Sequence, residues 1–172
     1  MKKAFIFDRD GTINIDKNYL YKIEDFEFIQ GVPMVLKELR QKGYLLILIT
    51  NQSGIARGYY SVNDMEKLHQ YIQEKLAIHN AQFDKIYYCP HHPEGIVPEY
   101  SIRCECRKPG KALFERAISE YDIDVEKSYA VGDKDRDLLP AKMLGINCIK
   151  LSSEKDANWK TVTSFDRLIE II

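Results

Sequence analysis

The stretch FIFDRDGTIN, residues 5–14, carries the strongest indication of how this chain folds. A short apolar run ends directly in two carboxylates, Asp8 and Asp10. Two carboxylates this close together at the mouth of a buried strand repel each other and lose hydration, which disfavours their charged forms. The fold alone does not need this arrangement. The pattern therefore predicts that a positive charge lies beside the two aspartates.

Further short apolar runs alternate along the chain with segments of helical spacing. We expect buried strands at residues 3–7, 44–49, 85–88, 128–132 and 146–151. We expect helices at residues 32–41, 61–79, 111–121 and 135–144, and a short last helix that is capped by Ser164 and runs through Ile171. Gly43 is expected to cap the end of the first helix, and Ser61 with Asp64 resembles a capping pair at the start of the second. The alternation predicts an α/β fold, with a Rossmann-like parallel sheet and helices on both faces.

Length and composition indicate an ordinary globular protein. The chain has 172 residues and a formal net charge of -1, with no basic run and no internal repeat. We therefore expect a single domain over residues 1–172 and no binding to nucleic acid or membranes. The first apolar run ends at Asp8, too early for a signal peptide, and no stretch approaches the roughly 20 residues that span a bilayer. We expect a cytoplasmic monomer.

Polar side chains with a shared chemistry follow the predicted strands. Ligands of parallel sheets bind beyond the carboxyl ends of the strands. Asp8 and Asp10 follow the first strand, Thr50 the second and Asp133 the fourth, and Lys108 follows the long irregular segment after the third. If these residues converge, they place three carboxylates, one hydroxyl and one ammonium together. Phosphoryl transfer through an aspartate requires such a set.

Each group in that set has a part in such a reaction. One carboxylate attacks phosphorus, and a divalent cation lets the two anions approach each other. Mg²⁺ suits carboxylate and water ligands. A second carboxyl protonates the departing alkoxide and later takes a proton from water, while a hydroxyl and a lysine hold the phosphoryl oxygens. The positive charge expected beside Asp8 and Asp10 is thus a metal ion.

Four segments, FDRDGT, TNQSG, RKP and GDKDRD, resemble in order the motifs of the haloacid dehalogenase superfamily of phosphatases. The resemblance covers nearly the whole chain. It implies that Asp8 is the nucleophile, that Asp10 is the general acid and base, and that Thr50 and Lys108 stabilise the phosphoryl group. It also implies that Mg²⁺ is held by Asp8, the backbone carbonyl of Asp10 and Asp133.

A cluster of metal-binding side chains lies in the irregular segment 89–108. Its members are Cys89, His91, Cys104 and Cys106. Three sulfurs and one imidazole form a closed tetrahedral zinc set, and a reducing cytoplasm disfavours disulfides. We therefore expect a structural Zn²⁺ that staples this loop and positions Arg107 and Lys108 at the active site. His92 is a competing ligand. Cys148 is expected to be a buried strand residue without a part in the chemistry.

The segments EDFEFIQGV, TNQSGIARG, YYCPHHP and CECRKP are similar to those of the heptose bisphosphate phosphatases, which carry such a zinc loop and lack a large cap domain. The resemblance implies a phosphatase that removes the 7-phosphate of D-glycero-manno-heptose 1,7-bisphosphate in nucleotide-heptose biosynthesis for surface polysaccharide. It also implies a small phosphorylated sugar as substrate. The implied sugar site comprises Asp16, Tyr19, Asn51, Gln52, Ser53, Arg107 and Lys134.

Other functions stay open at this point. The histidinol phosphate phosphatases are closely similar, zinc included, but their zinc loop is typically shorter, so residues 92–103 favour the heptose group. A broad sugar phosphatase of the same fold is a further alternative. A non-catalytic module that binds phosphate or metal is the alternative from another class. Asp137 is expected to cap or orient rather than bind metal, and His69 and His79 to be solvated on a helix surface.

Overall fold

A computed structural model describes residues 1–172, which form one six-stranded sheet. The strands are β1 Ala4–Phe7, β2 Leu45–Asn51, β3 Lys85–Cys89, β4 Tyr129–Gly132, β5 Asn147–Leu151 and β6 Lys160–Val162. Their order across the sheet is β3-β2-β1-β4-β5-β6, and all neighbouring strands are parallel. Strand β1 therefore lies inside the sheet, and its four residues are all buried. The predicted parallel sheet is confirmed.

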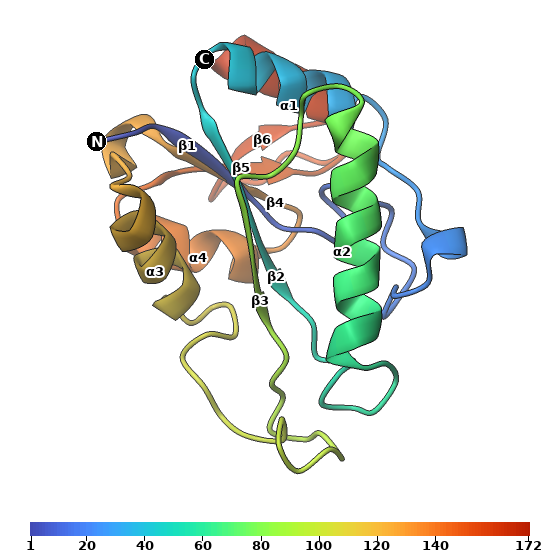
Figure 1. Cartoon of the computed structure of the whole chain (residues 1–172). Helices are drawn as coiled ribbons and strands as arrows, with labels where there is room; N and C mark the ends of the chain where they lie inside the picture. Colours follow the sequence, from blue (N-terminus) through green and yellow to red (C-terminus); the bar gives the residue numbers. More distant parts are fainter.

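Helices cover both faces of the sheet (Figure 1). The α-helices are α1 Val32–Gln41, α2 Val62–Ala77, α3 Ala112–Tyr121 and α4 Asp135–Met143, and the 3-10 helices are η1 Ile23–Asp25, η2 Val125–Lys127 and η3 Phe165–Ile171. One apolar cluster joins α1, α2 and η3 to the sheet, and a second joins α3 and α4 to its other face. Phe5 and Phe7 enter the first cluster, whereas Ala4 and Ile6 enter the second, as the alternation of side chains along a strand requires.

Most element boundaries agree with the sequence patterns to within one or two residues. The predicted capping pair is a capping box, in which Ser61 and Asp64 each bind the other's backbone N–H. The structure differs from the sequence patterns in two details. The edge strand β6 was not expected, because it is short and only Val162 in it is buried. The last helix is a 3-10 helix, and the Ser164 side chain does not cap it.

The strand order creates one place, between β1 and β4, where the chain leaves two neighbouring strands in opposite directions across the sheet. From β1 the chain adds β2 and then β3 on one side, and then crosses to β4 on the other side of β1. Ligands bind at such a switch point in open parallel sheets. The long loop after β3 extends from the carboxyl end of the sheet, where the switch point lies (Figure 1). No large cap domain is inserted between the strands, and no helix is long and apolar enough to cross a membrane.

Candidate active site

A polar cleft of about 400 Å³ lies at this end of the sheet. Asp8 and Asp10 enter it from the end of β1, and Asp137 from α4. All the residues that the sequence assigned to the sugar site line the same cleft. Most of its exposed lining is polar, so the cleft suits a hydrophilic, charged molecule.

Lys108 lies beneath the cleft as a buried counter-ion. Its Nζ is 2.7 Å from Oδ1 of Asp8 and 2.8 Å from Oδ1 of Asp137, and it donates to the carbonyl of Ile49 at 2.7 Å. Burial raises the pKa of Asp8 to about 7, although Lys108 opposes this shift. Burial also lowers the pKa of Lys108, but the two carboxylates outweigh it and the pKa is raised. The lysine therefore stays charged beside Asp8.

The end of β2 fixes the backbone of Lys108. The side-chain oxygen of Asn51 accepts the N–H of Lys108 at 2.9 Å, and its Nδ2 donates to the carbonyl of the same residue at 3.1 Å. Thr50, one residue earlier, is buried, and its hydroxyl oxygen accepts a hydrogen bond from Gln52 Nε2 at 2.8 Å. The end of β2 thus fixes the backbone of Lys108 through Asn51 and holds the Thr50 hydroxyl through Gln52.

Asp10 is held by three donors. Its Oδ1 accepts from Arg9 Nη2 and from Asn14 Nδ2, both at 3.0 Å, and its Oδ2 accepts from Gln52 Nε2 at 3.2 Å. Burial raises the pKa of Asp10, but the charge of Arg9 and these hydrogen bonds outweigh burial, so the pKa lies below its usual range. Part of the positive charge beside the two aspartates therefore comes from Arg9 and Lys108 of the protein itself.

The environment of His69 contradicts the sequence analysis. The expectation of a solvated histidine is wrong, because His69 is only 7% exposed and its Nε2 lies 3.1 Å from Arg9 Nη1. It lies on the buried face of α2, whose apolar members include Met65, Leu68 and Ile72. Their spacing was the available signal, since position 69 follows Met65 by four residues. His79, which was also expected to be solvated, is half-buried.

Three neighbouring carboxylates, two of which line the cleft, could hold a divalent cation. Oxygens of Asp8, Asp133 and Asp137 lie within 4.8 Å of one another. Both oxygens of Asp137 are engaged, one by Lys108 and one by the backbone N–H of Lys134. Oδ1 of Asp133 is buried without a hydrogen-bond partner. A hard cation such as Mg²⁺ fits that free oxygen, and Asp137 is better suited to orient Lys108 than to bind the metal.

Gly11 allows the chain to pass close to this carboxylate site. Its φ is +85°, and a Cβ at this position would lie 2.4 Å from Oδ2 of Asp133. Any other residue would displace Asp133 and strain the turn. Gly11 thus leaves room for the carboxylate of Asp133, a candidate metal ligand.

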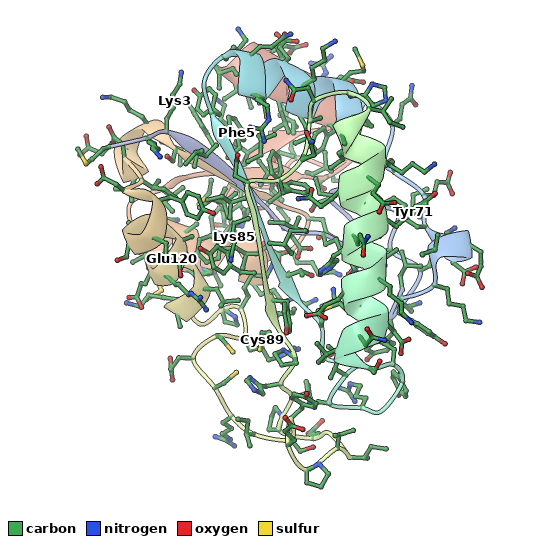
Figure 2. All side chains as sticks on the ribbon, viewed as in Figure 1. Lys3, Phe5, Tyr71, Lys85, Cys89 and Glu120 are labelled. Carbon is green, nitrogen blue, oxygen red and sulfur yellow. The ribbon has the colours of Figure 1, made fainter.

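The cysteine cluster is assembled in the long loop after β3. Sγ of Cys106 lies 3.1 Å from Sγ of Cys89 and 3.3 Å from that of Cys104, and Nδ1 of His91 lies 3.2 Å from Sγ of Cys106. Disulfide sulfurs are about 2.05 Å apart, so these thiols are free. Ligands about 2.0–2.3 Å from one tetrahedral ion would be roughly 3.5 Å apart. The four side chains therefore fit Zn²⁺. Figure 2 shows Cys89 at the end of β3, with other sulfur atoms nearby.

The competing ligand His92 does not join the cluster. Its Nε2 lies 3.2 Å from Arg57 Nη2, and its Nδ1 accepts the backbone N–H of Glu94 at 3.2 Å. His92 instead lines the cleft. Cys148 lies in β5 and is half-buried, apart from the cluster.

A group of cations at the rim was only partly found from the sequence. Arg107 and Lys134 were expected there, but Arg57 and Arg136 also line the cleft. Nη1 of Arg107 is buried without a hydrogen-bond partner, and so is Nε of Arg57. Burial and the nearby Arg136 lower the pKa of Arg107. Guanidinium groups with unused donors beside an open cleft suit an anion. The only signal for the missed arginines was their position within quoted motif segments.

The comparisons with known proteins agree on the family. The sequence family described as polynucleotide kinase 3 phosphatase matches residues 3–160. The D-glycero-beta-D-manno-heptose-1,7-bisphosphate 7-phosphatase of Haemophilus ducreyi is 51% identical over 146 residues, which is 84% of this chain and 80% of that protein. A relative from Photorhabdus laumondii, named for the alpha anomer, is 46% identical over 85% of this chain and 79% of its own length.

A solved structure agrees with these matches. The D,D-heptose 1,7-bisphosphate phosphatase from B. bronchiseptica, complexed with magnesium and phosphate, superposes with a TM-score of 0.85 and 26% identity over 99% of both chains. The chain therefore belongs to the polynucleotide kinase 3 phosphatase family of the haloacid dehalogenase superfamily, among the relatives named heptose-1,7-bisphosphate 7-phosphatases.

Proposed function

We propose that this chain is a Mg²⁺-dependent phosphatase that removes the 7-phosphate of D-glycero-manno-heptose 1,7-bisphosphate, as a cytoplasmic monomer in nucleotide-heptose biosynthesis for surface polysaccharide. The names of its relatives support this activity. The observation that carries it is one cleft with two separate centres of positive charge. Lys108 contacts Asp8 at the base, and Arg107 lies at the rim with an unused donor. A substrate with two phosphates matches both.

The first step transfers the phosphoryl group to the protein. A carboxylate oxygen of Asp8 forms a bond to phosphorus as the bond from phosphorus to the C7 oxygen breaks. The electron pair of the broken bond stays on that oxygen, which takes a proton from Asp10. Lys108 and Thr50 hold the phosphoryl oxygens as charge develops on them. Their burial keeps water from screening this interaction.

The second step restores the protein. A water molecule attacks phosphorus and gives a proton to Asp10, and the bond between phosphorus and Asp8 breaks to release inorganic phosphate. Mg²⁺ would be held by Asp8, by the backbone carbonyl of Asp10 and by Asp133. It supplies the positive charge that lets an anionic carboxylate and an anionic phosphate meet. The unpartnered Oδ1 of Asp133 supports this ligand set.

The remaining cleft residues bind the rest of the substrate. We assign the uncleaved phosphate to Arg107 and Lys134, with help from Arg57 and Arg136, which line the same cleft. The sugar hydroxyls face the polar groups expected from the sequence, namely Asp16, Tyr19, Asn51, Gln52 and Ser53. A structural Zn²⁺ on Cys89, His91, Cys104 and Cys106 holds the loop that presents Arg107. The short distances among these four side chains support that assignment.

The test is release of inorganic phosphate in Mg²⁺ buffer. Both anomers of heptose 1,7-bisphosphate are assayed beside heptose 7-phosphate and histidinol phosphate, with Asp8→Asn as the matched variant. We expect the bisphosphate to have the highest kcat/KM. We expect Asp8→Asn to keep its circular dichroism spectrum and lose turnover, because the amide keeps the shape and is not a nucleophile. Preference for histidinol phosphate, or a variant that retains more than a few per cent of the activity, contradicts the proposal.

A further inference from the structure

Both carboxylate oxygens of Asp10 are held by buried side chains that are themselves held from a distant part of the chain. Oδ1 accepts from Arg9 at 3.0 Å, and Oδ2 accepts from Gln52 at 3.2 Å. Arg9 and Gln52 are 1% and 2% exposed. Side chains this buried cannot exchange a lost partner for water, so whatever fixes their far ends also fixes Asp10.

The first support runs through Arg9 to α2. Arg9 Nη2 donates to the carbonyl of Leu20 as well as to Asp10, and Nη1 lies 3.1 Å from His69 Nε2. A guanidinium has donors only, so Nε2 of His69 must accept this hydrogen bond and the ring must be neutral. Burial, and next the charge of Arg9, lower the pKa of His69 to about 3, which agrees with a neutral ring. His69 therefore fixes the angle of the guanidinium against Asp10.

The second support runs through Gln52 to the residue just before the cap of α2. The Tyr60 hydroxyl donates to Gln52 Oε1 at 2.5 Å, while Nε2 of the same amide donates to Asp10 and to Thr50. The amide therefore has one orientation, with its oxygen toward Tyr60 and its nitrogen toward the carboxylate. Tyr60 is itself held by stacking on Tyr21, with the ring centres 5.1 Å apart.

We propose that His69 and Tyr60 are positioning residues, which act through Arg9 and Gln52 to hold the Asp10 carboxyl in line with the leaving oxygen. The inference rests on the proposed function, in that it takes Asp10 as the general acid. His69 is buried and lies behind Arg9, and Tyr60, although it lines the cleft, is linked to Asp10 only through Gln52. A general acid must stay within hydrogen-bond reach of its target, and small displacements of such a group cost much of the rate.

Matched variants separate this role from packing. Tyr60→Phe removes one hydroxyl and keeps the ring, and Tyr21→Phe is its control, because it removes a hydroxyl from the other ring of the same stack and Tyr21 makes no side-chain hydrogen bond. His69→Leu removes the acceptor, and His69→Gln keeps one. His79→Leu, just beyond the end of α2, is the control for His69→Leu. Melting temperatures identify any variant that fails to fold.

The decisive readout compares two leaving groups. A sugar alkoxide needs the proton of Asp10, whereas the phenolate of p-nitrophenyl phosphate departs without one. Because kcat/KM reports the first transfer to Asp8, we expect Tyr60→Phe to lose about three- to tenfold on heptose 1,7-bisphosphate. We expect His69→Leu to lose about ten- to a hundredfold there, with much of this restored in His69→Gln. Losses on p-nitrophenyl phosphate should be several times smaller, and the two controls should lose nothing.

Equal losses on the two substrates would mean that His69 and Tyr60 only support the fold. No loss on either substrate would mean that neither residue contributes to catalysis. If the wild-type protein does not hydrolyse heptose 1,7-bisphosphate but hydrolyses another alkyl phosphate, that ester is compared with p-nitrophenyl phosphate instead. In that case the proposed substrate fails while the inference is still tested. Should His69→Leu not fold, Tyr60→Phe and His69→Gln carry the test.

Discussion

At the scale of single residues, Arg107 separates the two ends of the proposed substrate. Lys108 points to Asp8 and Asp137, whereas Arg107 lines the cleft with a free donor. A charge-assisted hydrogen bond is worth roughly 1.5–3 kcal/mol. We therefore predict that Arg107→Ala lowers kcat/KM about ten- to a hundredfold on heptose 1,7-bisphosphate, and much less on heptose 7-phosphate.

Two further variants sharpen that measurement. Arg107→Lys should recover little, because an ammonium cannot bind phosphate through a bidentate fork. Arg103→Ala, an exposed arginine of the same loop, should behave like the wild type. If Arg107→Ala loses equally on the bisphosphate and the monophosphate, Arg107 serves the reacting phosphate or the loop instead.

His69 should make the stability of the protein depend on pH. Its pKa is lowered to about 3 by burial and by Arg9, from an ordinary value of 6.5. Below pH 6.5 the unfolded chain therefore binds a proton at His69 that the folded chain does not bind until about pH 3. The free energy of unfolding should fall by about 1.4 kcal/mol for each pH unit in this interval.

The measurement is urea unfolding at pH 7.5 and 5.5 for the wild type and for His69→Gln. Glutamine does not titrate, so the variant should lose about 1.4 kcal/mol less than the wild type between these two values. His79→Gln is the control and should keep the slope of the wild type. An unchanged slope in His69→Gln would show that His69 does not stay neutral in the folded protein.

The residues that the sequence predicted differ in kind from those it missed. Asp8, Asp10 and Lys108 could be named in advance because a motif carries them and strand ends converge. Arg57 lies in a motif segment, but nothing local says that its guanidinium turns toward the cleft. His69 was expected to be exposed because a polar residue on a helix ordinarily is. Its burial is explained only by the buried Arg9, which donates a hydrogen bond to its ring.

At the scale of elements, the loop after β3 should depend on its metal. Structural zinc binding contributes directly to the free energy of folding. We predict that the purified protein carries about one zinc per chain in addition to its Mg²⁺ site. Cys104→Ser should lower the zinc content and the melting temperature together, while Cys148→Ser, outside the cluster, should keep its zinc. Elemental analysis and thermal unfolding measure both, and freshly purified protein without zinc would contradict this prediction.

Helices and strands could be predicted from the sequence where they are long enough for their buried residues to repeat at the helical or strand spacing. Helix α2 has both an apolar stripe and a capping box, so its start was found to within one residue. Strand β6 has three residues, of which only Val162 is buried, and it pairs only with β5. Too few alternating positions exist there to distinguish a strand from a loop. Helix η3 has apolar spacing, which does not by itself separate an α-helix from a 3-10 helix.

At the scale of the whole molecule, the two metal sites should respond differently to chelators. Asp8 and Asp10 of the proposed Mg²⁺ site line an open cleft, whereas four side chains would close the proposed zinc site, and Cys89 among them is fully buried. We predict that brief EDTA treatment abolishes activity, that added Mg²⁺ restores it, and that zinc content and melting temperature hardly change. Chelation in denaturant should remove zinc as well, and Mg²⁺ alone should then fail to restore activity. Loss of zinc during brief EDTA treatment would count against a closed site.

The sequence predicts that the sheet is parallel, but it does not predict the order of the strands. Alternation of strands and helices predicts a parallel sheet, because each crossover needs a helix. It does not say on which side of β1 each new strand is added. The order β3-β2-β1-β4-β5-β6 therefore had to come from the structure, and this order brings Asp8 and Asp133 to one switch point.

The central place of β1 also matters while the chain is being made. Of the six strands of this sheet β1 is synthesised before the others, yet one of its two neighbours is β4, about 125 residues later in the chain. Until that strand exists, β1 has an open apolar edge, the N–H of Ala4 lacks the Ser128 hydroxyl, and that of Asp8 lacks the Val131 carbonyl. An exposed strand edge can pair with other chains. Asp8, the proposed nucleophile, is thus synthesised long before the strand that holds its backbone N–H, so nascent chains that stall before β4 should be inactive and prone to aggregate.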